Sequence, residues 1–393
     1  MNLVAKLVAG IVGGTLVGTF APDILVRLFL TFQQIGGQLI GFAIPLIILF
    51  YIASGIASLP KNSGNLLGKT VGLAYGSTIV AGCLAFLAAT IVLSGLEPSV
   101  APNVEAQREL TGLVNIEIPA VFGVMTALGL AFLFGIGISV TGSQPLKQFA
   151  DDGRAIIDLL LAKVIIPMLP IYIAGVFANM GAEGTVFATL KTFGLVLVTA
   201  VIVHWIWISI QYVIAGMVSG QSPVRLLKNM IPAYFTALGT MSSAATIPVT
   251  LKQTKENGVK EPIANFTIPL CATIHLSGST ITLVLCATAV MALSTNIEMV
   301  SFFSMIPFIM MLGITMIAAP GAPGGAVMAA LGLMASMLGF GEAELALMIA
   351  LYMAQDSFGT ACNITGDGAI SMLVNRTADS SNAKKVKQPV ASS

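Results

Sequence analysis

Long apolar runs separated by short polar segments make up most of the chain. The first six runs cover residues 3–20, 24–59, 66–96, 120–140, 156–177 and 186–217. A membrane-spanning helix needs about 20 apolar residues, so each run predicts one span. The second, third and sixth runs are longer, which predicts strong tilt or extension beyond the bilayer.

Three later apolar runs carry residues that interrupt a helix. These runs are 230–251, 263–293 and 300–340, with interruptions at 240–244, 275–279 and 318–325 respectively. The third interruption contains two prolines and three glycines, which cannot continue a helix. Non-helical backbone at membrane depth must be buried by protein or line a wet cavity. The interruptions therefore predict a transporter-like site where the broken elements meet.

Charged residues indicate which runs cross the membrane, because basic residues favour the cytoplasmic side. If the N-terminus is cytoplasmic and the first six runs each cross once, the acidic segment 97–119 lies outside. Lys252, Lys255 and Lys260 then remain inside only if the run before them enters the membrane and returns. Run 300–340 has acidic, lysine-free flanks, so it predicts a second hairpin that enters from the outside.

The predicted fold is an all-α membrane protein with eight transmembrane helices and two opposed re-entrant helical hairpins. Residues 1–217 form six helices, 224–254 hairpin one, 262–294 a broken seventh helix, 299–340 hairpin two and 341–376 helix eight. The core is expected to comprise residues 218–376. Residues 377–393 are expected to be a disordered polar tail. Lys147, Asp151, Asp152 and Arg154 are expected to mark the side opposite the acidic segment, with Lys147 and Arg154 in the cytoplasm. Both termini are expected in the cytoplasm and the protein in the inner or plasma membrane.

The composition supports this class. The chain has 393 residues, of which 56% are hydrophobic and 9% charged, whereas a soluble domain carries about 25% charged residues. The net charge of +1 provides no basic field for nucleic acid. The four cysteines lie in apolar stretches without paired spacing and are interpreted as packing residues.

The stretch 352–376 carries polar residues at helical spacing. Asp356, Thr360, Asn363 and Asp367 share one face of a helix. A carboxylate at membrane depth costs about 2.5–3.5 kcal/mol, so two of them predict a site for a cation or an ammonium group. The two carboxylates are about 16 Å apart along a helix, which is too far for a shared acid–base pair. No catalytic triad or set of metal ligands is evident, so an enzyme is not expected.

Four motifs in the C-terminal half resemble the dicarboxylate/amino acid:cation symporter family, which includes glutamate and neutral amino acid transporters. The motifs are Ser242-Ser243-Ala244-Ala245-Thr246-Ile247-Pro248, Pro269-Leu270-Cys271-Ala272-Thr273-Ile274, Gly321-Ala322-Pro323-Gly324 and Asp356 with Thr360 and Asn363-Ile364-Thr365-Gly366-Asp367. The resemblance implies a homotrimer with a fixed scaffold domain and a transport domain that moves as an elevator. The segments Gln355-Asp356-Ser357 and Ser242-Ser243-Ala244-Ala245 are similar to those of the serine/threonine carrier branch.

The resemblance also implies roles for residues of the eighth helix. Asp367 and Asn363 match a sodium-coordinating pair, and Asn363 also matches the residue that binds the substrate's α-carboxylate. Asp356 matches the residue that pairs with the α-ammonium group. The structural alternatives are a helix-capping or interhelical contact for Asp367 and an internal ion pair for Asp356.

The hairpin tips are expected to close the site. Ser242 and Ser243 would offer hydroxyl and backbone N–H groups to the substrate carboxylate, since helix N-termini favour anions. The alternative is a small-residue packing motif. Gly321, Ala322 and Gly324 would form a flexible tip whose backbone covers the substrate.

Two departures from the family pattern indicate which substrate the protein transports. Carriers of acidic amino acids have an arginine at the position of Gly359 and often another at the position of Met241. Without a guanidinium group a second carboxylate would be buried unpaired. We therefore expect a small to medium neutral amino acid, such as serine, threonine or alanine. Gly359 is expected to widen the pocket, with Met241 and Thr360 among the neighbours of the substrate side chain.

The seventh span also departs from the family. His275 replaces an asparagine and Ser277 an aspartate that hold a further sodium ion, so fewer coupled sodium ions are expected. Thr273, Thr78 and Tyr75 are candidates for a partial site. His275 alternatively carries a coupling proton, since its ordinary titration lies near neutrality. His204, beside two tryptophans, is interpreted as an interfacial or packing residue.

The resulting prediction is a sodium-coupled secondary active symporter of neutral amino acids that works by alternating access. One alternative is a proton-coupled amino acid carrier or a carboxylate carrier of the same family. An alternative from another class is a conductive channel, which two closing hairpins disfavour.

Overall fold

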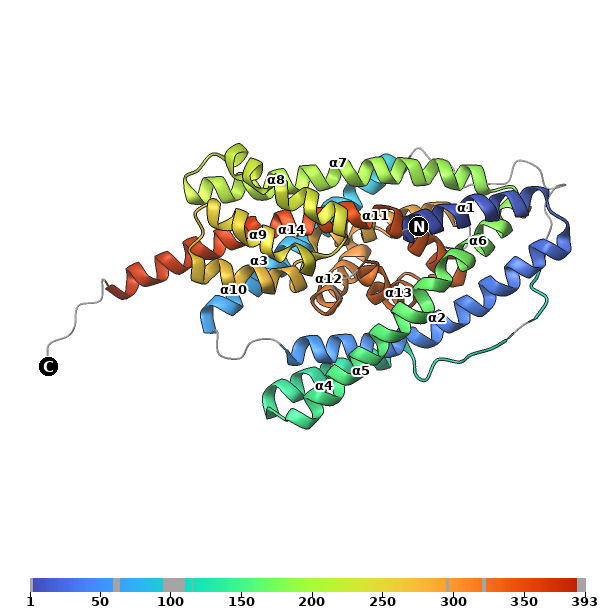
Figure 1. Ribbon diagram of the computed structural model, residues 1–393, viewed down its shortest axis with the longest axis horizontal. Helices are drawn as coiled ribbons and strands as arrows, with labels where there is room; N and C mark the ends of the chain where they lie inside the picture. The colour runs from blue at the N-terminus through green and yellow to red at the C-terminus, as the bar shows by residue number, and fades with distance from the viewer. Residues whose placement is uncertain are drawn as a thin grey trace.

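The computed structural model describes residues 3–58, 64–94, 110–114, 116–294, 297–319 and 323–386. Within these ranges the regular elements are helices, arranged in an elongated body from which the last helix projects (Figure 1). They are α1 (Leu3–Phe20), α2 (Asp23–Ala57), α3 (Gly64–Leu93), α4 (Val124–Thr141), α5 (Gln144–Leu160), the π-helical turn Leu161–Ile165, α6 (Ile166–Glu183), α7 (Val186–Ser219), α8 (Pro223–Thr240), α9 (Ser243–Glu256), α10 (Glu261–Ile274), α11 (Ser277–Leu293), α12 (Phe302–Ala318), α13 (Gly325–Met337) and α14 (Glu342–Val386).

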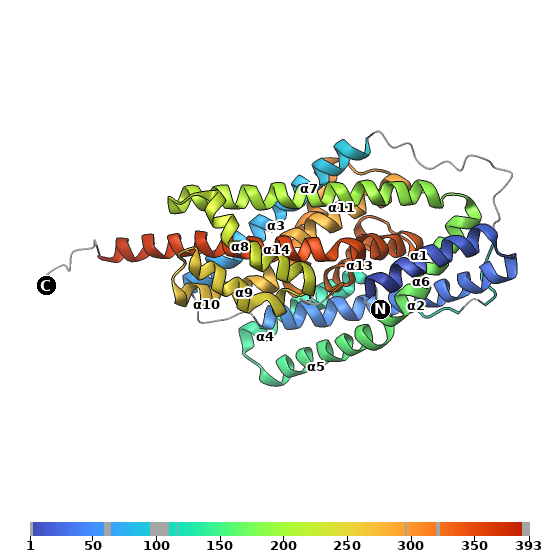
Figure 2. The same ribbon diagram turned by 45° about the horizontal axis from the view of Figure 1, so that its top comes forward.

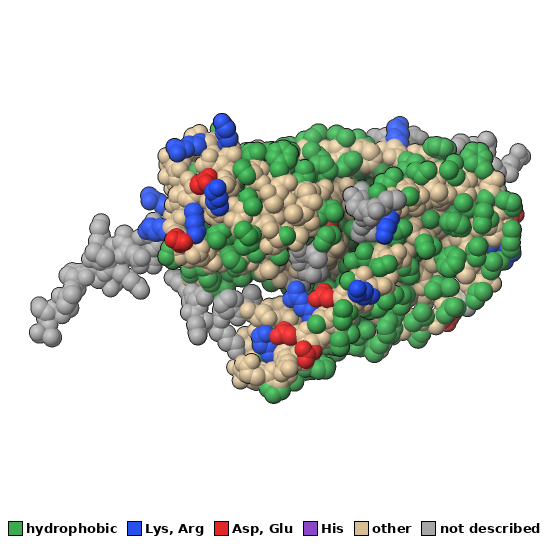
Figure 3. All heavy atoms as spheres, viewed as in Figure 1, with side chains coloured by type: hydrophobic (Ala, Val, Ile, Leu, Met, Phe, Trp, Pro, Cys, Tyr) green, Lys and Arg blue, Asp and Glu red, His purple; other side chains and the backbone are tan. Residues whose placement is uncertain are grey.

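The surface and the helix lengths are those of a membrane protein. Seven helical stretches in the described part of the chain are long and apolar enough to cross a bilayer. Large apolar side chains remain on the outside, and Phe303 and Val140 are each 80% exposed, as expected of a surface that faces lipid. On the face shown in Figure 3, most Lys and Arg side chains gather toward the end from which α14 projects. The all-helical membrane class is therefore confirmed.

The helices form two groups. α1, α2, α4, α5 and α6 pack mainly on one another, and α3 packs with α7, α11 and α12 in the other group. α14 runs through the second group and contacts α7, α8, α9, α10 and α11 (Figures 1 and 2). The predicted pairs of helices are present, since α8 packs on α9 and α12 on α13. The broken elements are thus assembled around α14.

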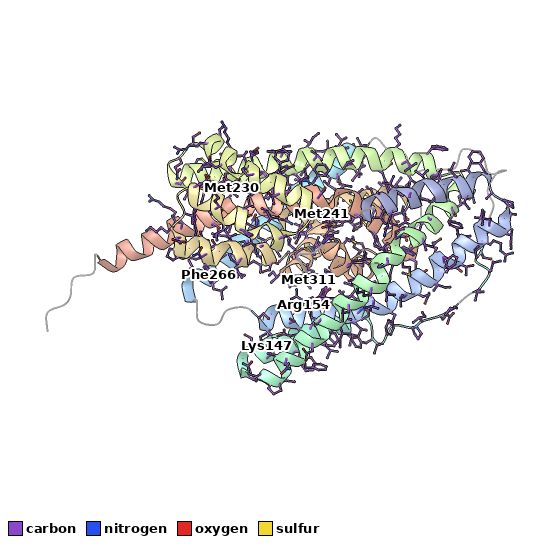
Figure 4. All side chains as sticks on the ribbon, in the orientation of Figure 1. Lys147, Arg154, Met230, Met241, Phe266 and Met311 are labelled. Atoms are coloured by element: carbon purple, nitrogen blue, oxygen red, sulfur yellow. The ribbon has the colours of Figure 1, made fainter. Side chains whose placement is uncertain are left out.

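The charged segment between the fourth and fifth runs is helical. Its charged residues lie on α5, which continues through the π-helical turn into α6 (Figure 4 labels Lys147 and Arg154 on this arm). Polar contacts with α2 fix this helix: Tyr51 donates to Asp158 Oδ1 at 2.5 Å and Ser54 donates to Asp151 Oδ1 at 2.7 Å. Asp151 and Asp158 therefore pair with hydroxyl groups of a neighbouring helix, whereas Asp152 is exposed.

The predicted end of the last helix is wrong. α14 extends to Val386, ten residues beyond the expected end at 376. Residues 377–386 contain no proline or glycine, so nothing in this segment breaks the helix, although its polar composition favours solvent. Residues 387–393 of the expected disordered tail, like most of segment 97–119, lie outside the described residues.

Candidate functional site

The middle of α14 faces the places where the other elements are interrupted. α10 and α11 are separated at His275 and Leu276, and α13 begins after Gly324. Asp356, Asn363 and Asp367 each bond to one of these breaks. All three side chains are buried, with exposed fractions of 4%, 2% and 0%. Helix breaks expose backbone groups that have no partner within a helix, and the polar stripe of α14 supplies those partners.

Asp356 of α14 lies beside the N-terminal end of α13. Its Oδ2 accepts a hydrogen bond of 2.7 Å from the backbone N–H of Gly324, the residue that precedes the helix. Gly324 has φ 75°, in the left-handed region that favours glycine. The N-terminal end of a helix stabilises a carboxylate. An ionised carboxylate accepts up to about four hydrogen bonds, so Asp356 retains capacity for an ammonium group.

Asn363 of α14 lies beside the N-terminal end of α11. Its Oδ1 accepts hydrogen bonds from the N–H groups of Gly278 at 2.7 Å and Ser279 at 3.2 Å. Its Nδ2 donates to Ser279 Oγ at 2.9 Å. An amide oxygen has two lone pairs, whereas the NH₂ group has two hydrogens. In this arrangement Oδ1 is fully used, and Asn363 can offer an N–H group to an anion more readily than an oxygen to a cation.

Asp367 ends a chain of buried hydrogen bonds. His275 Nδ1 is 2.9 Å from Asp367 Oδ1, and His275 Nε2 is 2.8 Å from Ser77 Oγ. Gln211 Nε2 donates to the same Ser77 oxygen at 3.0 Å. Because an amide nitrogen can only donate, the Ser77 hydrogen is available for His275 Nε2, and Nδ1 then donates to the carboxylate. With a neutral imidazole, each hydrogen bond of the chain is donated in the same direction, from Gln211 through Ser77 and His275 to Asp367.

Two buried oxygens near this chain lack partners. Asp367 Oδ2 and Gln211 Oε1 have no hydrogen-bond partner among the residues that the structure describes. Gln211 Oε1 and His275 Cε1 both lie within 3 Å of the position that a Cβ on Gly366 would take, at 2.7 and 2.9 Å. A buried acceptor without a donor is costly, so the chemistry of these oxygens suits a bound cation or a water molecule.

Several hydroxyl groups predicted to bind substrate or cation are used by nearby backbone. Thr360, Thr78 and Thr273 donate to the carbonyls of Asp356, Ala74 and Leu270 on their own helices. Tyr75 donates instead to Met310 of α12. Threonine in an apolar helix readily bonds the carbonyl one turn before it, and a hydroxyl that donates its hydrogen keeps oxygen lone pairs that can bind a cation. The roles predicted for these residues therefore stay predictions.

Ser277 and Ala322 complete the predicted set. Ser277 is fully buried, and its hydroxyl has no hydrogen-bond partner in the described part of the chain. It begins α11 beside the His275 break, so a role near the cation stays a prediction. Gly321 and Ala322 lie outside the described residues.

The first hairpin turns at Met241 and Ser242 (Figure 4 labels Met241 near the centre of the molecule). Met241 has φ 50°, a left-handed conformation that costs a residue other than glycine about 1 kcal/mol or more. Ser242 Oγ accepts from the N–H of Ala245 at 3.3 Å and so caps α9. Ser243 is buried, with 3% exposed. The hydroxyl expected to bind substrate therefore has a local capping contact at Ser242.

Gly359 does not face an open pocket. A Cβ at this position would lie 3.2 Å from Thr282 Oγ1 and 3.4 Å from the carbonyl oxygen of Gly278. The expectation that Gly359 widens the pocket is therefore wrong. On the opposite side of this contact, a Cβ on Gly278 would lie 2.4 Å from the Gly359 oxygen. The two glycines allow α11 and α14 to approach closely.

Two residues near the site, Ser77 and Gln211, were not predicted from the sequence, and His204 was predicted only as an interfacial or packing residue. Ser77 and Gln211 bond as described above, and His204 is 1% exposed with Nε2 3.0 Å from the Gly278 oxygen. His204 is therefore buried beside the site, in agreement with the packing alternative, and its ring also makes polar contacts. The available signal was the spacing of His204 and Gln211, since residues seven apart share one face of a helix. Polar residues in an apolar span are expensive and indicate a site.

Comparisons with known proteins identify the family. Residues 3–377 match the model of the sodium:dicarboxylate symporter family. A C4-dicarboxylate transport protein of Paracoccus denitrificans is 24% identical over 415 residues, covering 95% of this chain and 86% of that protein. Human excitatory amino acid transporter 1 is 28% identical over 275 residues, covering 67% of this chain and 50% of that protein. The neutral amino acid transporter B(0) of Oryctolagus cuniculus is 26% identical over 278 residues, covering 67% and 50%.

The match spans half the length of the two mammalian relatives and most of the bacterial one. The family consists of transporters, so the expectation of a transporter and not an enzyme is confirmed. The resemblance read from the four motifs is confirmed as well. With its helical breaks gathered on a polar stripe of α14, the chain belongs to the sodium:dicarboxylate symporter family.

Proposed function

We propose that the protein is a secondary active symporter of small to medium neutral amino acids, driven by sodium. It would act in the inner or plasma membrane as a homotrimer, with α3 and α7 to α14 moving as an elevator against the other helices. The observation that carries the proposal is the placement of Asp356 and Asn363 on one face of α14, each at the start of another helix.

These two side chains suit the two ends of an amino acid. Asp356 offers a buried carboxylate to an ammonium group, and Asn363 offers an N–H group to a carboxylate. They are seven residues apart, about 10 Å along the helix. A zwitterionic amino acid that makes one contact at each end can bridge that span.

The arrangement of charges supports a neutral cargo. Gly359 lies in a helix contact, and Arg376 is about 30 Å from Asp356 along α14 at 1.5 Å per residue. A side-chain carboxylate at the site would therefore have no guanidinium partner on this helix, and a buried unpaired charge is strongly unfavourable. The relatives carry names for acidic, neutral and C4-dicarboxylate cargo, so a direct substrate panel is the decisive measurement.

Two coupling ions have support from the geometry. Oδ2 of the buried Asp367 carboxylate has no partner among the described residues, and this supports sodium, because hard cations bind to oxygen ligands. The contact between Asp367 and His275 favours the proton as a second candidate. In that case a protonated imidazole would supply the positive charge at Asp367, and sodium would be dispensable.

Uptake by purified protein in liposomes tests the proposal. Radiolabelled serine is offered under a sodium gradient at equal pH, or under a pH gradient without sodium. We expect saturable uptake driven by sodium, with no competition from aspartate or succinate. Asp356→Ala should abolish uptake, and Asp152→Ala, which removes an exposed carboxylate of α5, should not change it.

Each alternative has its own outcome in this assay. Uptake driven by the pH gradient alone would overturn sodium coupling in favour of the His275 proton. Uptake of succinate or aspartate but not serine would overturn the neutral substrate. Flux that rises linearly with concentration, without saturation or exchange, would indicate a channel.

A further inference from the structure

His204 is a buried polar residue that the proposed transport chemistry does not use. It lies on α7, which runs beside α11 and α14 (Figures 1 and 2). Its Nε2 is 3.0 Å from the carbonyl oxygen of Gly278 and 3.2 Å from Thr282 Oγ1. The side chain reaches from a third helix to the peptide at which α11 meets α14.

The direction of this hydrogen bond follows from the chemistry of its partner. A carbonyl oxygen only accepts, so Nε2 of His204 carries the hydrogen and donates it to Gly278. Nδ1 is buried and has no hydrogen-bond partner among the described residues. The contacts of Nε2 with Gly278 and Thr282 therefore account for the imidazole's orientation.

Gly278 is held on three sides. Its carbonyl accepts from His204 at 3.0 Å and from the Thr282 hydroxyl at 3.2 Å, and its N–H donates to Asn363 Oδ1 at 2.7 Å. Its Cα faces α14 without room for a side chain. Gly278 and Ser279 are the second and third residues of α11. The first N–H groups of a helix have no partner within it, so Asn363 is the partner that these groups depend on.

The geometry points to His204 as a positioning residue of the substrate site. Together with the Thr282 hydroxyl, His204 holds the Gly278 carbonyl, which lies in the same peptide plane as the Ser279 N–H that donates to Asn363 Oδ1. This contact fixes the start of α11 against Asn363 and so orients Asn363 Nδ2 toward the substrate carboxylate. This inference rests on the proposed role of Asn363 in amino acid binding. His204 itself touches neither the substrate nor the cation.

Three substitutions on α7 test the inference. His204→Leu removes the donor, and His204→Gln keeps a nitrogen donor at a similar reach. Trp207→Phe is the matched control, since Trp207 is buried on the same helix and its Nε1 has no partner in the described part of the chain. Serine uptake is measured at saturating sodium, and thermal unfolding is measured without ligand.

We expect His204→Leu to raise KM at least fivefold with Vmax within twofold of the parent protein. His204→Gln should restore KM to within twofold, and Trp207→Phe should leave it unchanged. In the background of Asn363→Ala, His204→Leu should add no further increase in KM. A lower unfolding temperature without a change in KM, failure of the glutamine variant to restore KM, or additive effects with Asn363→Ala would overturn the inference.

Hydrogen–deuterium exchange separates this inference from the proposed function. If the parent protein neither binds nor transports serine, the proposed function fails, and the amides of Gly278 and Ser279 still report the hydrogen bonds to Asn363. His204→Leu should then speed their exchange at least fivefold, whereas His204→Gln and Trp207→Phe should not. Unchanged exchange in His204→Leu would show that His204 does not hold this peptide.

Discussion

Replacing Asp356 by asparagine separates the two contacts proposed for its carboxylate. Asparagine keeps an oxygen that can accept the 2.7 Å hydrogen bond from Gly324 N–H, but it removes the charge. Removing one partner of a buried ion pair costs about 3–5 kcal/mol, and each 1.36 kcal/mol is a factor of ten in affinity. Because Asp356 is only 4% exposed, solvent screens it little, and we expect serine affinity to fall at least about 150-fold.

Asp356→Ala is the companion variant because it removes both contacts. It should lose affinity as Asp356→Asn does. It should also unfold at a lower temperature without ligand, because a hydrogen bond to a charged group contributes about 1.5–3 kcal/mol. Serine binding is measured by titration calorimetry at saturating sodium, with thermal unfolding of the same samples. If Asp356→Asn binds serine within threefold of the parent protein, Asp356 does not pair with the ammonium group.

Two further predictions concern the surroundings of the site. Gly278→Ala would place a Cβ 2.4 Å from the Gly359 oxygen; overpacking costs about 1–3 kcal/mol, so both the unfolding temperature and serine affinity should fall. Gly194→Ala, where nothing lies within 4 Å, is the control, and equal effects of the two substitutions would contradict the reasoning. Ser77→Ala leaves His275 Nε2 without a partner, at a cost of about 1–3 kcal/mol, and should raise the cation concentration for half-maximal uptake more than it raises KM for serine. Ser77→Thr keeps the hydroxyl and should restore the cation dependence; an unchanged dependence in Ser77→Ala would refute a link between this chain and coupling.

Much of the architecture could be predicted from local sequence. Apolar length indicated the helices, and the prolines and glycines of 318–325 indicated a break between α12 and α13. The break at His275 and the turn at Met241 were predicted as well. Local reasoning did not reveal the α5 helix or the contact of its Asp151 with Ser54 of α2. A pattern along one segment does not reveal which neighbouring helix will satisfy its polar groups.

The sequence by itself determined the membrane class, the interruptions and the stripe of Asp356, Asn363 and Asp367, because apolar length, helix breakers and helical periodicity are properties of a single segment. Only the tertiary structure decided what those side chains contact. It brought His275 between Ser77 and Asp367, carried His204 to Gly278, and turned Gly359 into a helix contact. These contacts join residues from different helices, and their partners depend on how closely and in which rotation the helices pack.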